Sequence, residues 1–115
     1  MGKTVYEYKR MLIVMELRKY RWSKDYESAE EELITLLKVR NINAERWVAD
    51  EGSHIAAIQI EGDKRLWCAE GSLTVTVGAK RFSLQPGDTL DIPGKSVVEI
   101  QAGIAGCVCY EQKSS

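Results

Sequence analysis

The sequence predicts a mainly β protein, a single-domain antiparallel β-barrel or sandwich with one α-helix near its N-terminus. Its 115 residues suit one domain with one hydrophobic core. Beyond Asn43 the chain divides into short strand-like segments, and Gly, Asp or Pro separates most of them. Many short strands joined by tight turns are typical of an antiparallel barrel or sandwich.

The N-terminal part is the least regular. Residues 1–10 are polar and aromatic without a clear period, and we treat residues 1–14 as an extension beyond the domain. From Leu12 to Trp22, apolar and charged residues partly alternate, which predicts a strand, although the same run would also fit a helix.

One segment has the signature of a helix, over about residues 28–40. Ser28 and Glu31 have the spacing of a capping box, in which each side chain satisfies a free backbone amide. The acidic run Glu30–Glu32 suits the positive end of the helix dipole and needs no functional explanation. Asn41 suits the position where the helix ends. Apolar residues recur on one helical face: Ala29, Leu33, Leu36 and Leu37.

The strand-like segments read AERWVAD, HIAAIQI, KRLWCAE, SLTVTV, KRFSL, DTLDI, SVVEI and CVCYE. Short turn signals, EG and AG among them, are expected to separate these segments. The clearest pair is a hairpin, in which Leu73, Val75 and Val77 alternate with threonines. Gly78–Ala79 then suits a two-residue turn whose first position needs a positive φ.

Composition excludes several classes of function. The formal net charge is −1 and the pI is about 5.9, so no charge excess draws the chain to nucleic acid or anionic lipid. The apolar run Met11–Met15 is too short for a membrane span or a secretory signal, and we expect a cytoplasmic protein. An odd number of cysteines, Cys68, Cys107 and Cys109, favours reduced and buried thiols over disulfides.

The stretch LWCAEGSLTVTVGAKRFSLQPGDTLDIP closely resembles the cupin superfamily of small jelly-roll β-barrels. The resemblance lies in the order of four features: Glu70–Gly71 at a strand end, the hairpin, Pro86–Asp88, and Ile92–Pro93. The N-terminal part also looks like a subgroup of single-domain cupins, through Trp22, the acidic helix and Trp47. The resemblance implies a cupin domain over residues 15–112 that includes the predicted helix.

Cupins hold a metal through a His-x-His pair, a nearby Glu or Gln, and a third histidine. Aligned on Gly71, these positions fall on Ile58, Ile60, Lys64 and Val98. Isoleucine and valine have no lone pair, and an ammonium repels a divalent cation. The chain has a single histidine, His54, so a three-histidine site is excluded. A thiolate zinc site normally needs four ligands, and the chain has three cysteines, so core packing is favoured for them.

The candidate ligand-binding residues are therefore those that face the barrel lumen: Ile58, Ile60, Lys64, Cys68 and Val98. These side chains either fill the lumen, which the sequence favours, or line a narrow pocket for a small apolar molecule with Lys64 at its mouth. The most specific enzymatic hypothesis is that a desolvated Lys64 has a lowered pKa and acts as a nucleophile or base. No partner acid or base can be named for it. We assign no catalytic residue, metal or cofactor.

Three functional hypotheses follow. The first is a metal-free, non-catalytic cupin that binds a small molecule or acts as a regulatory module. The resemblance implies that this protein is a homodimer. The second is a metal-independent isomerase or epimerase that uses the lumen, for which the residues are too few. The third is a structural protein–protein interaction module with a filled lumen. Trp67 should face away from the lumen, toward the helix or an interface, while Trp47 suits the core or a dimer interface.

Overall fold

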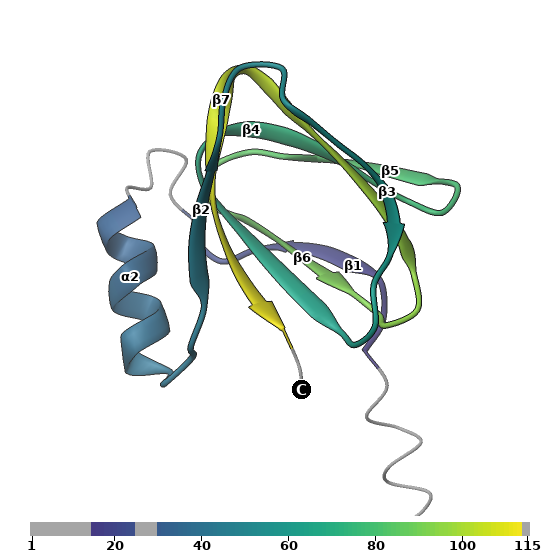
Figure 1. The fold of residues 1–115 in the computed structure, drawn as a ribbon. Coiled ribbons are helices and arrows are strands. Elements are labelled where there is room, and N and C mark those ends of the chain that lie inside the picture. The colour runs from purple at the N-terminus through teal and green to yellow at the C-terminus, as the bar shows by residue number, and fades with distance from the viewer. Residues whose placement is uncertain (1–14, 25–29, 114–115) are drawn as a thin grey trace, which may run out of the picture.

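The computed structural model describes residues 15–24 and 30–113, and these form one helix and one antiparallel sheet (Figure 1). Within these ranges the helix is α2 (Glu30–Val39), and no described helix is long and apolar enough to cross a membrane. The strands are β1 (Arg18–Arg21), β2 (Glu45–Ala49), β3 (His54–Gln59), β4 (Lys64–Val77), β5 (Lys80–Leu84), β6 (Asp88–Ile92) and β7 (Val97–Lys113).

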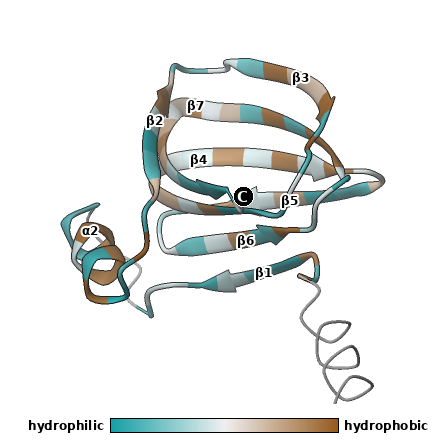
Figure 2. Cartoon of the chain, turned by 60° about the horizontal axis from the view of Figure 1, so that its bottom comes forward, coloured by the Kyte–Doolittle hydropathy of each residue, from teal (hydrophilic) through white to brown (hydrophobic). Residues whose placement is uncertain are grey.

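The strands form a single curled sheet. Its order is β1-β6-β4-β7-β2, with β3 paired to β7 and β5 paired to β4 (Figure 2). The predicted mainly β, antiparallel jelly-roll class with one helix is confirmed. The sheet does not close into a continuous barrel, because β2 and β3 each pair only with β7 among the described strands.

Two strands are longer than predicted, because each joins two of the predicted segments. KRLWCAE and SLTVTV form the single strand β4, and SVVEI and CVCYE form β7, so EG and AG are not turns. Glu70–Gly71 lies at shifts in the β4–β7 register, where the strand bulges and bends. Gly71 has a φ of +70°, and a Cβ there would lie 2.1 Å from the carbonyl oxygen of Gly106. Only glycine combines that backbone with that approach.

The predicted hairpin is confirmed. Val77 pairs with Lys80 across the turn, and Gly78 has a φ of +59°. The predicted end of the helix is confirmed too, because Asn41 has a φ of +55° and closes a Schellman motif. In that motif Ile42 N–H donates to the Leu37 carbonyl at 2.8 Å, and Asn41 N–H donates to that of Lys38 at 3.0 Å. The proposed N-cap Ser28 lies outside the described residues.

Helix α2 covers the outer face of the sheet near β2 (Figure 1). Its buried Leu33 and Leu37 pack with Trp67, Val108 and Tyr110 in a cluster separate from the main core. Trp67 therefore faces the helix and not the lumen, as the sequence predicted.

At the opposite edge, β1 is shorter than the predicted strand Leu12–Trp22, whose first three residues lie outside the described part of the chain. Buried Asp88 and Asp91 of β6 anchor it: Arg21 pairs with Asp88 at 3.1 Å and the Tyr20 hydroxyl donates to Asp91 at 3.0 Å. These charge-assisted contacts are strong because the carboxylates are shielded from water.

Candidate functional site

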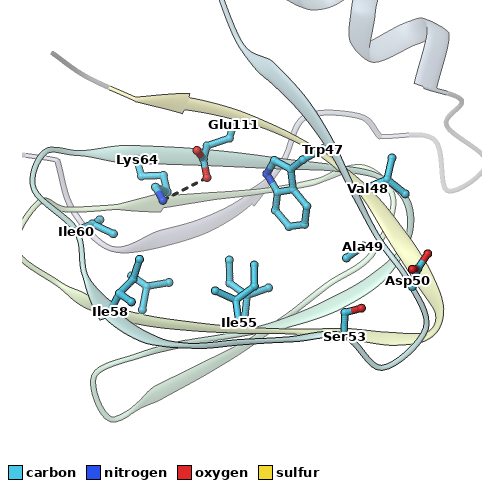
Figure 3. Close-up of a pocket in the computed structure, with 12 residues that line it drawn as sticks. Trp47, Val48, Ala49, Asp50, Ser53, Ile55, Ile58, Ile60, Lys64 and Glu111 are labelled. Atoms are coloured by element: carbon cyan, nitrogen blue, oxygen red, sulfur yellow. Dashed lines mark ion pairs between the residues drawn. The ribbon is translucent and has the colours of Figure 1, made fainter.

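A pocket of about 540 Å³ opens where β2 and β3 leave the sheet unclosed (Figure 3). Its walls are mainly apolar, and the residues that form them come from β2, β3 and β7 as well as the loop after β3: Trp47, Ile55, Ile58, Ile60, Val98 and Ile100. A pocket of this size suits a small organic molecule. The expectation of a filled lumen is therefore wrong.

An irregularity in β3 brings two of the isoleucines to the same wall. Side chains of a regular strand alternate, so Ile55 and Ile58, three residues apart, would point to opposite faces. The β3–β7 register shifts between them: Ile55 pairs with Ile100, and Ile58 pairs with Val98. This bulge turns both side chains toward the pocket.

The pocket has one charged pair in its wall. Lys64 Nζ lies 3.2 Å from Glu111 Oε1, and the two side chains are only 15% and 12% exposed. The other carboxylate oxygen of Glu111 lies 3.5 Å from Nζ of Lys113, which is 66% exposed. Lys64 thus lies in the pocket wall, within a small network of two ammonium groups and one carboxylate.

The opposite end of the pocket is also polar. Asp50 and Ser53, in the turn between β2 and β3, lie there, and Figure 3 shows them across the apolar walls from Lys64 and Glu111. The pocket therefore has a basic–acidic pair at one end, an acidic residue and a hydroxyl at the other, and an apolar middle.

Four of the five predicted lumen residues, Ile58, Ile60, Lys64 and Val98, line this pocket. Cys68 does not. It is completely buried in the main core. The neighbouring thiol of Cys107, that of Cys68 and burial together raise the pKa of the Cys109 thiol. All three cysteines are free and buried, as predicted.

Sequence reasoning missed Glu111, Trp47 and Ile55 as pocket residues. Lys64 pairs in register with Lys113, so Glu111, two residues back on β7, lies diagonally opposite on the same face. No sequence signal gives that register. Trp47 was expected in a core or a dimer interface; it packs against the main core while partly buried, and it also forms part of the pocket wall.

The residues present do not fit the metal that cupins hold. The four expected ligand positions carry two isoleucines, a valine and a lysine that is already paired with Glu111. In residues 15–24 and 30–113 there is no group of three or more His, Cys, Asp or Glu side chains arranged to hold a metal ion. His54 is half exposed and contacts Glu99, outside the pocket-lining set.

Comparison with known proteins bears on the fold alone. No family profile and no curated protein matches the sequence. Among solved structures, a DUF861 family protein from Thermotoga maritima superposes with a TM-score of 0.61 at 15% identity, covering 86% of this chain and 100% of that one. A cupin superfamily protein from Desulfitobacterium hafniense gives a TM-score of 0.57 at 12% identity, over 85% of this chain and 76% of that one.

A salicylate 1,2-dioxygenase from Pseudaminobacter salicylatoxidans gives a TM-score of 0.55 at 18% identity, over 82% of this chain but only 34% of the enzyme. At these identities the likeness concerns architecture and not activity. The chain has the cupin-superfamily fold.

Proposed function

We propose that this cupin-fold protein is a non-catalytic module that binds a small, mainly apolar molecule in the pocket between β2, β3 and β7. The observation that carries the proposal is the pocket itself, with isoleucines that keep much of their surface exposed. Ile55 is 45% and Ile58 is 55% exposed. Covering apolar surface gains about 25 cal/mol per Å², so a ligand that covers these side chains gains free energy.

The arrangement of the charged groups in the pocket wall supports binding over catalysis. Lys64 is held against Glu111, and a protonated ammonium has no lone pair with which to attack a substrate. The acidic residue at the far end, Asp50, lies across the pocket from that pair. Nucleophile and base would have to be within hydrogen-bond reach of a common substrate atom.

The homodimer expected from the sequence stays a prediction, which sedimentation of the purified protein would test.

The test uses N-phenyl-1-naphthylamine, a neutral aromatic probe whose fluorescence rises in apolar surroundings. We expect saturable binding with one probe per chain. Ile58→Trp puts a larger side chain into the pocket and should weaken binding at least about tenfold, equivalent to about 1.4 kcal/mol.

The matched control is Ile104→Trp, which enlarges another exposed isoleucine, 84% exposed and outside the pocket. This variant should bind the probe as the parent protein does. Non-saturable binding, or equal loss of affinity in both variants, would overturn the proposed function. A thermal unfolding curve for each variant verifies that both are folded.

A further inference from the structure

We infer that the ligand is an amphiphilic monoanion, whose acidic group is held by Lys64 and the Trp47 indole while its apolar body lies along the β3 isoleucines. This inference rests on the proposed function and adds the charge and the orientation of the ligand. It is carried by the charge balance at one end of the pocket, the position of the indole nitrogen, and the opposite charge at the other end.

The charge balance at the Lys64 end is positive. Glu111 is a single carboxylate shared by two ammonium groups, Lys64 at 3.2 Å and Lys113 at 3.5 Å. One positive charge therefore remains uncompensated in this group. The next basic residue, Arg65, points to the other side of the strand, where it pairs with Asp91 at 2.5 Å.

The uncompensated charge is available to a ligand inside the pocket. Lys113 is 66% exposed and is screened by water, whereas Lys64 is 15% exposed and lines the pocket. Attraction between charges strengthens as water is excluded, so Lys64 is the cation that a bound anion would meet. Glu111 keeps Lys113 as a partner when Lys64 turns partly to the ligand.

Trp47 supplies a second donor. Figure 3 shows its indole ring beside Glu111, with the ring nitrogen on the side that faces Glu111 and Lys64. Among the described residues this N–H makes no hydrogen bond to the protein, and Trp47 is only partly buried. A ligand oxygen placed between the indole N–H and the ammonium would accept from both.

The far end of the pocket sets the orientation. Asp50 lies there with the Ser53 hydroxyl, so an anionic group at that end would meet a like charge. Between the two ends the walls are Ile55, Ile58 and Ile60 together with β7 side chains. An anionic group at Lys64 therefore leaves the ligand's apolar part against the isoleucines.

A matched pair of probes tests the inference. The anion 8-anilino-1-naphthalenesulfonate has the scaffold of N-phenyl-1-naphthylamine plus one sulfonate, so the pair isolates the contribution of the charge. Lys64→Met keeps an apolar stem of similar length and removes the cation. It should weaken binding of the sulfonate at least about tenfold and change binding of the neutral probe by less than about threefold.

Glu111→Gln gives the readout that a merely structural ion pair would not produce. Because it removes the competing carboxylate, sulfonate binding should tighten about threefold or more, with little change for the neutral probe. Lys80→Met, an exposed lysine of β5 outside the pocket, is the matched control and should change neither probe.

The outcomes separate the two proposals. If the neutral probe binds saturably but Lys64→Met weakens both probes equally, or Glu111→Gln weakens the sulfonate, the anionic ligand is refuted while the binding pocket stands. If neither probe binds saturably to the parent protein, the proposed function itself fails.

Discussion

The two ends of the sheet use similar apolar residues in opposite ways. At the closed end, leucines of β4, β5 and β6 meet in the core, and Leu66, Leu73, Leu84 and Leu90 are all at most 2% exposed. At the open end, Ile55 and Ile58 of β3 are 45% and 55% exposed and enclose a pocket of about 540 Å³. The strands β4 and β7 run through both ends.

The difference follows from how many elements cover each side chain. The leucines of β4 have β5 and β6 hydrogen-bonded to their strand and the curled sheet across from them. Strand β3 is bonded only to β7 among the described strands, and its isoleucines face the pocket, with Trp47 and Lys64 in the walls across from them. Substitutions at the closed end are therefore limited by the stability that they cost. Residues at the open end can be chosen for contact with a ligand at a smaller cost in stability.

The largest expected effect on stability comes from truncating one side chain at each end of the sheet and comparing the two costs. Leu66→Ala, at a fully buried position, should lower the free energy of unfolding by about 3–5 kcal/mol, because it removes packed atoms and leaves a cavity. Ile58→Ala, at a half-exposed position, should cost less than about 1 kcal/mol. Urea unfolding of both variants measures the difference. Equal costs would mean that the open end is packed in solution.

A second substitution tests the bend in β4 at Gly71, which allows this strand to run through both ends of the sheet. Gly71→Ala places a Cβ 2.1 Å from the carbonyl oxygen of Gly106 at a φ of +70°. We expect a loss of about 2–4 kcal/mol from backbone strain and forced displacement.

Gly78→Ala is its control, since that glycine has a similar φ of +59° but open space around the added Cβ. It should cost about 1 kcal/mol. If both variants lose the same stability in urea, the close approach of Gly71 to Gly106 is not a constraint.

The smallest expected effect concerns the helix, which packs on the sheet without a pocket. Hydrogen bonds from Arg46 and Tyr110 lower the pKa of Glu30 below its ordinary value of 4.5. A lowered folded-state pKa stabilises the fold above the ordinary pKa, and this contribution is lost as the pH falls through the lowered value. Melting temperatures of Glu30→Gln should therefore fall less than those of the parent between about pH 6 and pH 3.

The control for this measurement is Glu32→Gln, an exposed position on the same helix. It should follow the parent protein across the pH range. A Glu30→Gln protein with the same acid sensitivity as the parent would show that the contact with Arg46 and Tyr110 does not stabilise the helix.

Local chemistry determined what the sequence predicted correctly. The alternation of Leu73, Val75 and Val77 and the Gly78 turn specify the hairpin, because strand period and positive φ are properties of a few neighbouring residues. Asn41 ends the helix for the same kind of reason. The resemblance to the cupin motif, aligned on Gly71, placed the four lumen positions that line the pocket.

Tertiary structure alone decided the rest. A bulge in β3 brings Ile55 to the wall beside Ile58, and a one-residue shift in register turns a side chain to the other face. The ion pair between Lys64 and Glu111, which are 47 residues apart in the sequence, depends on the register of β4 against β7. Whether isoleucines fill a lumen or line a pocket depends on how many layers surround them, which the order of residues along the chain does not specify.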